Sequence, residues 1–377
     1  MEIVIEKDIF LEALQLIASI SSKATTTPII NNILLEINRI DGEDYLQFKA
    51  TNYDKSFLGN FRIKTITPGK LCMSFIRLFN LVREFRESEI KISSTPQNWV
   101  YLICGNSKVK LPSVDPGLYP IIEFKQMPNQ ISISAESFKT AIDRTFFTIG
   151  ENESRKNLMG LNFQIENNRK IRWIGADGFR ISQCYTELES ETDITGNSII
   201  PKNSLVDIKR MLSGNRGDVM IGFNENEFQV LSQFVKFKTR LIEADYPNLN
   251  TLINKTGEVT LDIPKDDFTN AIRIISTLSE GEPNAYVKLA FQEGKVSISS
   301  QKMDFGEGKD EIPCDYSGRE IKIGLSIRFL LEAMIAFDSA PDDRIRVNLS
   351  KTVSPFTIFC EKWENFKTIL MPIHTEW

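Results

Sequence analysis

The sequence has a single histidine, His374, close to its C-terminal end. A Ser-His-Asp or Cys-His catalytic arrangement would have to use this residue, and it lies in no recognisable motif. No cysteine and histidine cluster has the spacing of a zinc site, and no glycine-rich phosphate loop follows a strand pattern. Acidic pairs such as Asp342 and Asp343 are more often solvated loop ends than metal ligands. The sequence therefore predicts no catalytic residues, no cofactor and no metal ion.

Long hydrophobic runs and paired cysteines are also missing. No segment has the unbroken apolar length of a membrane span. The charged residues Glu2, Glu6 and Lys7 stand where a signal peptide needs an apolar region. The five cysteines are far apart in the sequence, which predicts reduced and mostly buried side chains. These features favour a cytoplasmic protein with no membrane partner.

An excess of positive charge is missing too. The formal net charge is −5 at pH 7, whereas a typical nucleic-acid-binding protein has a basic isoelectric point and clustered lysine and arginine. Net charge is a sum, however, and it does not say which face of a molecule carries which sign. The rest of the composition, with 41% hydrophobic and 25% charged residues, is that of a folded protein with enough apolar residues for several cores.

The sequence does contain one pattern three times. A short alternating strand pattern leads into a helical pattern with the motif Phe-x-x-Ala, and the three phenylalanines are Phe10, Phe138 and Phe268. Their spacing of about 130 residues is the size of a whole domain, not that of a short solenoid repeat. Three copies of one domain indicate architecture, because an enzyme needs its chemistry assembled only once.

Each copy is predicted to be α+β, with two helices packed on one face of a mainly antiparallel sheet. Asp8, Ser134 and Pro264 are candidate starts of the first helix. A second helix is predicted in each copy, within 74–81, 201–208 and 326–333. Alternating runs at 33–37 and 161–165 predict strands, and linkers are expected near 126–130 and 254–258. The predicted domains are 1–127, 128–256 and 257–377.

One turn is specific to the middle copy. Residues 176–180 read Ala-Asp-Gly-Phe-Arg, and Asp-Gly alone predicts only a hairpin tip. The corresponding residues 50–54 and 299–301 lack the motif. One alternative is an enzyme of an unrecognised three-domain type, which would need a group of catalytic residues confined to one copy. Only this turn is confined to one copy, and it contains no recognisable nucleophile, general base or metal site. A generic interaction scaffold with no role on DNA is the other alternative.

Several passages resemble the bacterial sliding clamp family, the beta subunits of DNA polymerase III. They are spread over the whole chain in the order of the family, and together with the threefold repeat they form a specific pattern. The passages are Thr-Pro-Ile-Ile-Asn-Asn at 27–32, Leu-Met-Gly at 158–160, the turn at 176–180, Ile-Pro-Lys at 200–202, Ala-Asp-Tyr-Pro at 244–247, Tyr-Ser-Gly at 316–318 and Leu-Met-Pro at 370–372.

The resemblance implies a head-to-tail homodimer that closes into a ring of six similar domains. Such a ring encircles double-stranded DNA without sequence specificity. It tethers the replicative DNA polymerase, the clamp loader and repair proteins through short linear peptides, and so confers processivity in DNA replication. It would be a processivity factor and not an enzyme. Topological binding also reconciles an acidic protein with DNA, since a sliding ring needs only a modest basic lining.

The resemblance implies three sets of site residues. The DNA-facing set consists of basic residues on or near the repeated helices, with two just before Leu158: Lys23, Arg77, Lys139, Arg144, Arg155, Lys156, Lys202, Lys209, Arg210, Arg273 and Arg328. The dimer interface is expected to join Val109 and Leu111 on an edge strand to Thr277 and Leu278 of the other protomer.

The third set is a peptide-binding cleft, expected to be an apolar groove with a few polar groups. Its family-matched positions are Leu158, Ala176, Gly178, Phe179, Arg180, Ile181, Pro247, Thr251, Leu252, Phe329, Val353, Pro355, Ile369, Leu370, Met371, Pro372 and Ile373. The family often has His at the position of Phe179, a basic residue at Thr251 and Tyr at Phe329. Members of the family also usually end one or two residues after the position of Pro372 and Ile373, whereas this sequence continues with His374–Trp377. The sequence therefore predicts a cleft that is more apolar and less basic than usual, with Trp377 able to fold over it or to pack on a neighbour.

Overall fold

The structure is a computed structural model that describes residues 1–21, 27–166, 169–215, 217–278, 282, 284–300, 306–350 and 354–375. The chain divides into two compact units. The first consists of Met1–Lys139 and Asn203–Leu241, and the second of Thr140–Lys202 and Ile242–Trp377. The middle copy of the sequence repeat is therefore shared between both units.

Each copy opens with a strand that runs directly into a helix, as the repeat predicts. Phe10, Phe138 and Phe268 are all fully buried, which confirms the apolar stripe of these helices. The hydroxyl of Ser134 accepts a hydrogen bond from the Ser137 amide at 3.5 Å, as an N-cap does. Asp8 is not a cap, because it already lies in the first turn of its helix. The three pairs are β1 (Glu2–Glu6) with α1 (Lys7–Ser21), β10 (Asn129–Ser134) with α3 (Ala135–Thr145), and β18 (Val259–Pro264) with α6 (Lys265–Thr277).

The second helix of each copy also follows a strand without a loop. Ser74, Pro201 and Ser326 are the last residues of these strands, so the sequence signals mark the helix starts correctly. The hydroxyl of Ser326 caps its helix by accepting from the Phe329 amide. The pairs are β6 (Lys70–Ser74) with α2 (Phe75–Glu84), β14 (Asn197–Pro201) with α4 (Lys202–Leu212), and β22 (Ile321–Ser326) with α7 (Ile327–Ala336).

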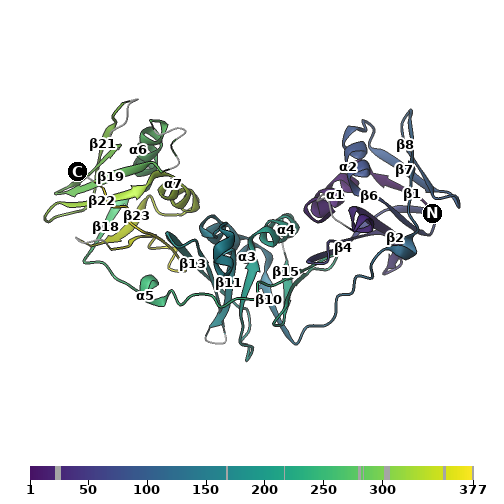
Figure 1. The fold of residues 1–377 in the computed structure, drawn as a ribbon, viewed down its shortest axis with the longest axis horizontal. Helices are drawn as coiled ribbons and strands as arrows, with labels where there is room; N and C mark the ends of the chain where they lie inside the picture. The colour runs from purple at the N-terminus through teal and green to yellow at the C-terminus, as the bar shows by residue number, and fades with distance from the viewer. Residues whose placement is uncertain are drawn as a thin grey trace. The chain divides into compact units, whose positions relative to one another are not determined.

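The first unit contains two antiparallel sheets (Figure 1). α1 and α2 contact each other, and α1 packs on β3 (Glu43–Thr51) and β4 (Lys55–Arg62). The five-stranded sheet has the order β5 (Lys64–Thr67), β1, β7 (Glu89–Ser94), β8 (Trp99–Cys104) and β9 (Ser107–Pro112). The eight-stranded sheet has the order β10, β15 (Asp218–Phe223), β16 (Glu227–Leu231), β17 (Val235–Arg240), β4 (Lys55–Arg62), β3 (Glu43–Thr51), β2 (Asn32–Ile40) and β6.

In the eight-stranded sheet the first and middle copies of the repeat share one ladder. β17 of the middle copy pairs with β4 of the first copy, with Phe237 opposite Phe57. A buried ion pair joins the same two copies, because Nζ of Lys55 in β4 lies 2.7 Å from Oδ2 of Asp207 in α4. The pairing of strands from different copies explains why the compact units do not coincide with the sequence repeat.

The second unit repeats this arrangement with the middle and third copies. β13 (Arg180–Glu187) pairs with β25 (Phe366–Leu370), and the buried hydroxyls of Ser182 and Thr368 lie 2.9 Å apart between these two strands. Its eight-stranded sheet has the order β14, β11 (Gly160–Glu166), β12 (Lys170–Ala176), β13 (Arg180–Glu187), β25 (Phe366–Leu370), β24 (Phe356–Phe359), β23 (Arg344–Leu349) and β18. Its four-stranded sheet has the order β21 (Lys309–Pro313), β20 (Lys295–Ser300), β19 (Tyr286–Gln292) and β22.

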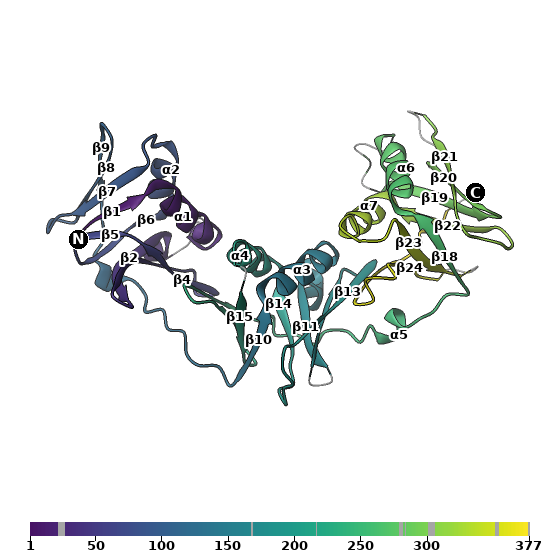
Figure 2. The ribbon, with the colours of Figure 1, turned by 180° about the vertical axis from the view of Figure 1, so that it is seen from behind.

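In this second unit, α6 and α7 lie on one side of the sheets, whereas the short helix α5 (Asn250–Ile253) lies on the other side (Figures 1 and 2). Lys367 in β25 holds α5 in place, because its Nζ donates to the carbonyl oxygen of Ile253 at 2.8 Å. Burial lowers the pKa of this ammonium group. Every strand pairing of the described residues in both units is antiparallel, and the predicted α+β class is confirmed.

The cysteines are free and buried, as the sequence predicts. Burial raises the pKa of the Cys72 thiol to about 12, so this group is an inert core side chain. Among the described helices, none combines the length and the apolar character that crossing a bilayer requires.

Candidate functional site

The turn between β12 and β13, which only the middle copy carries in full, is held by its own aspartate. Oδ1 of Asp177 accepts from the amides of Phe179 at 2.9 Å and Arg180 at 3.0 Å. Gly178 adopts φ of +93°, a conformation that costs a residue with a Cβ free energy. Gly178 therefore allows Asp177 and Arg180 to close a tight turn with a defined shape.

Arg180 ties this turn to α7 of the third copy. Its Nε donates to Oδ2 of Asp177 at 2.9 Å, and its Nη1 donates to the carboxylate of Glu332. The guanidinium carbon lies 4.2 Å from the ring centroid of Phe329. Because the Arg180 side chain is almost fully buried and doubly paired, it positions the turn and is not a free cation for a ligand.

An apolar hollow, which we call the cleft, lies on the α5 side of the eight-stranded sheet. Its base is a buried cluster that includes Leu158, Ile181 and Ile369. The backbone amide of Met371 donates to the carbonyl oxygen of Phe179 at 2.8 Å, so the C-terminal segment forms one wall of the cleft beside the turn. The lining residues are Leu158, Ala176, Gly178, Arg180, Ile181, Pro247, Leu249, Leu252, Ile369 and Met371.

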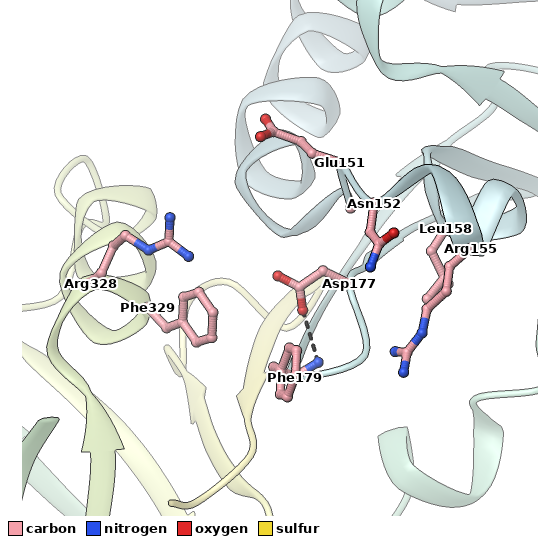
Figure 3. Close-up of a pocket in the computed structure, with 9 residues that line it drawn as sticks. Glu151, Asn152, Arg155, Leu158, Asp177, Phe179, Arg328 and Phe329 are labelled. Carbon is pink, nitrogen blue, oxygen red and sulfur yellow. Dashed lines mark hydrogen bonds between the residues drawn. The ribbon is translucent and has the colours of Figure 1, made fainter. Parts of the chain in front are cut away.

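A second hollow, which we call the turn pocket, lies beside the cleft and has a volume of about 300 Å³ (Figure 3). Leu158 lines both hollows. The carboxylate of Glu151 at its rim accepts a 2.9 Å hydrogen bond from Lys202, and this bond holds the pKa of Glu151 below its usual value. The lining residues are Gly150, Glu151, Asn152, Arg155, Leu158, Asp177, Phe179, Arg328 and Phe329.

The structure brings most of the expected cleft residues together. Nine of the seventeen expected residues line the cleft itself. Two others, Phe179 and Phe329, line the turn pocket. Leu370 is 1% exposed and points to the face opposite Ile369, so it supports the cleft from the core. Val353 lies outside the described residues. Thr251, Pro355, Pro372 and Ile373 line neither hollow.

The sequence did not indicate Leu249 as a member of the cleft. This residue precedes α5 in a segment without regular structure, so no periodic pattern points to it. The C-terminal segment continues past the cleft to β22, where the amide of Ile373 donates to the carbonyl oxygen of Gly324 at 2.8 Å. Trp377, for which the sequence left open folding over the cleft or packing on a neighbour, lies outside the described residues.

The expected DNA-facing residues fall into three groups. Arg144 is 9% exposed, with its guanidinium carbon 3.8 Å from the Trp363 ring centroid and Nη1 donating to Asn365 at 3.2 Å. The guanidinium group of Arg144 is therefore bound inside the protein, and Arg144 is not a member of the proposed DNA-facing set. Lys23 lies outside the described residues. Lys139, Lys202 and Arg210 are half-buried, and Arg77, Arg155, Lys156, Lys209, Arg273 and Arg328 are exposed.

The expected dimer residues lie beside two edge strands. Val109 and Leu111 are partly exposed residues of β9, the outer strand of the five-stranded sheet. Leu278 packs beside Gly308, where an added Cβ would lie 2.7 Å from Cδ1 of Leu278. Gly308 immediately precedes β21, the outer strand of the four-stranded sheet. Thr277, the last residue of α6, is exposed next to it.

Comparison with known families accounts for nearly the whole chain. The N-terminal, central and C-terminal domains of the DNA polymerase III beta subunit match residues 1–123, 132–248 and 250–374, respectively. The chain belongs to the DNA polymerase III beta-subunit family. This result confirms the resemblance drawn from the sequence motifs.

Relatives and solved structures agree with membership of the beta-subunit family. Proteins named beta sliding clamp from Staphylococcus epidermidis and Staphylococcus aureus are 26% and 25% identical over 380 residues, and the matches cover 100% of both chains. The DNA polymerase sliding clamp of Bacillus subtilis has a TM-score of 0.89 at 23% identity, with 100% of each chain covered. A beta sliding clamp of Caulobacter crescentus also has a TM-score of 0.89, at 22% identity, covering 100% of this chain and 99% of the other. At these identities the structural matches demonstrate the shared fold.

Proposed function

We propose that this protein is a DNA sliding clamp, a non-enzymatic ring that encircles duplex DNA and tethers a replicative DNA polymerase and other partners in the cytoplasm. The observation that carries the proposal is the match of all three family domains, in order, along one chain. The relatives named beta sliding clamp, which align over their full length, support it further.

The two edge strands support a head-to-tail homodimer. β9 carries Lys108 and Lys110, and β21 carries Asp310 beside Lys309 and Glu311, which pair with each other. An exposed edge strand tends to pair with another chain, and the opposite charges of the β9 lysines and Asp310 favour this pairing. Pairing of β9 in one protomer with β21 in the next would extend both sheets and close a ring by twofold symmetry. In that ring we propose three clamp domains per protomer, with boundaries near residues 127 and 256.

The exposed basic residues named above, other than Arg155 and Arg328, which line the turn pocket, are the proposed DNA-facing residues. Lys139, Lys202 and Arg210, which are half-buried, complete the set. Two of these three already have protein partners. Nζ of Lys202 donates to the Ile149 carbonyl oxygen at 2.9 Å, and Arg210 lies 3.6 Å from Asp207. A small number of exposed cations attracts phosphate only weakly, which suits a ring that slides. The cleft is the proposed site for short linear peptides from the polymerase, the clamp loader and repair proteins.

The proposal predicts that retention on DNA depends on topology. The protein is loaded onto nicked circular duplex with a clamp loader, and bound and free protein are separated by gel filtration. We expect the complex to persist on the circle in high salt and to dissociate when a restriction enzyme linearises the DNA, because a closed ring can leave only over an end. Equal retention on circular and linear DNA would contradict encirclement. Linearised DNA whose two ends are blocked by bound proteins serves as the control, because a closed ring should stay on it.

The cleft predicts a second result. Replacing Met371 by alanine removes part of the cleft wall, and Leu158→Asp places a charge in its base. With a fluorescein-labelled ten-residue peptide that carries two adjacent leucines, we expect affinity to fall about tenfold for Met371→Ala and about a hundredfold for Leu158→Asp. Fluorescence anisotropy measures both affinities, and the melting temperature identifies a folding defect in Leu158→Asp.

Leu118→Asp is the matched control, since Leu118 is 65% exposed and belongs to the first unit. This variant should bind the peptide like the parent protein. Unchanged affinity in Met371→Ala and in a folded Leu158→Asp would show that peptides bind elsewhere.

A further inference from the structure

We propose that the turn pocket makes the cleft selective for partner segments in which an aromatic side chain stands next to a carboxylate. The inference rests on the proposed function, since it takes the cleft as the site of partner peptides. The inference specifies the chemistry of the partner residues that reach beyond the cleft into the turn pocket.

The first support is an aromatic pair in which Phe179 is exposed and Phe329 is partly buried. The side chain of Phe179 is 60% exposed at the tip of the turn. Its ring centroid lies 6.4 Å from that of Phe329, with 30° between the ring planes. Neither side chain has a polar atom, so this wall of the pocket offers no hydrogen bond to a polar residue of a partner. A third aromatic ring, in contrast, can pack on the exposed ring of Phe179 with favourable geometry.

The second support is the charge balance of the turn pocket. Its two acids already have partners within the second unit, because Asp177 pairs with Arg180 at 2.9 Å and Glu151 pairs with Lys202 at 2.9 Å. Arg155 and Arg328 form no ion pair with any side chain that the structure describes. The pocket therefore keeps two guanidinium charges for a ligand, and a carboxylate is the group that suits them.

The positions of these two arginines bring the aromatic and cationic features together. The guanidinium carbon of Arg328 lies 4.9 Å from the ring centroid of Phe329. Nη1 of Arg155 lies against Gly178 in the turn. In Figure 3 the two guanidinium groups lie on opposite sides of the turn that carries Phe179. A carboxylate on either side of an aromatic ring that packs on Phe179 would therefore face one of the two cations.

The third support is the continuity of the turn pocket with the cleft. Leu158 lines both hollows, and the turn from Asp177 to Arg180 borders each of them. The cleft is apolar, whereas the turn pocket is aromatic and cationic. One extended segment that crosses the turn can place aliphatic residues in the cleft and its aromatic and acidic residues in the turn pocket. We therefore assign the turn pocket to the same partner segment as the cleft.

The test uses fluorescein-labelled ten-residue peptides that all contain two adjacent leucines. Each peptide also carries one of four residue pairs, Phe-Asp, Phe-Asn, Ala-Asp or Ala-Asn. The pair is placed one to three residues before or after the leucines. In at least one placement, the Phe-Asp peptide is expected to bind about 10-fold more tightly than the Ala-Asn peptide. About 3-fold or more of this preference should come from the aromatic ring and the remainder from the carboxylate.

Variants assign each part of the preference to a residue. Phe179→Ala should remove the advantage of Phe over Ala in the peptide, measured as the ratio of the two affinities for the same variant. Arg155→Gln combined with Arg328→Gln should remove the advantage of Asp over Asn and its dependence on salt. Arg86→Gln is the matched control, because Arg86 is exposed in the first unit and belongs to none of the proposed sites.

The outcomes separate this inference from the proposed function. If the leucine peptides bind but the four pairs are equivalent in every placement, the turn pocket plays no part in selection and the inference is overturned while the cleft stands. If no peptide binds, both the inference and the peptide-binding role of the cleft are overturned. Retention on circular DNA, measured in parallel, shows whether the ring itself survives either result.

Discussion

Leu111→Asp is expected to convert the protein from a dimer to a monomer of 43.0 kDa and to abolish its retention on circular DNA. Leu111 is a partly exposed residue of the edge strand β9, on the same side as Val109 and opposite buried Val100. A carboxylate there would be desolvated without a partner when β9 pairs with another chain. The free protomer keeps the residue accessible to water, so the penalty falls on the dimer. Light scattering at micromolar concentration measures the mass.

A mixing experiment tests the head-to-tail geometry. Leu111→Asp damages the β9 side of the proposed interface, and Leu278→Asp damages the β21 side. If the two sides belong to different patches, a mixture of these variants retains one intact interface and should form an open dimer. This dimer would have the mass of the parent protein, yet circular DNA would not retain it.

Ile121→Asp is the control for the dimer experiment, since Ile121 is 88% exposed in the first unit and lies outside β9. It should leave mass and retention unchanged. A dimeric Leu111→Asp protein that stays on circular DNA would rule out β9 as the interface strand.

Lys55→Ala is expected to lower the free energy of unfolding by about 3–5 kcal/mol, the usual cost of leaving one member of a buried ion pair alone. The side chains of Lys55 and Asp207 are 7% and 1% exposed, and their charged groups lie 2.7 Å apart. Nζ of Lys55 also donates to the Asn203 carbonyl oxygen at 2.9 Å. Without the ammonium group, Asp207 would keep only the hydroxyl of Ser19 and the more distant Arg210. Urea unfolding measures the loss.

Lys49→Ala is the matched control, because Lys49 also pairs with a carboxylate in the first unit. Its partner Glu36 is 22% exposed and is bound by Lys70 as well, at 2.7 Å, so the expected loss is at most about 1 kcal/mol. The double variant Lys55→Met with Asp207→Leu should recover most of the stability lost in Lys55→Ala. Equal effects of Lys55→Ala and Lys49→Ala would show that burial of the first pair has no energetic consequence.

The local elements were predictable from the sequence because their signals are local. The phenylalanine of each first helix is buried, and each second helix begins directly after the predicted Ser or Pro. Asp8 was misplaced as a cap because a capping side chain and a first-turn acid look alike in sequence. The Asp-Gly turn was correctly placed between two strands, and its Asp177 hydrogen bonds follow from the short side chain.

The candidate site was predictable only in part. The apolar members Leu158, Ile181 and Ile369 came from family resemblance, since periodicity alone could not distinguish them from core residues. Arg144 shows the opposite failure, because a basic residue on a helix was expected to face DNA and instead packs on Trp363. A sequence shows the charge of a side chain, but it does not show which distant aromatic ring the side chain meets.

The sequence by itself determined the threefold repeat, the strand and helix order of each copy and the family to which the chain belongs. These features depend on periodicity, capping residues and motifs within short stretches of chain. The tertiary structure alone decided which strands pair across copies, β17 with β4 and β13 with β25, and therefore that the turn at 177–180 meets α7 and the C-terminal segment. The physical reason is that pairing between residues far apart in the chain depends on shape and burial in three dimensions, and no local pattern records it.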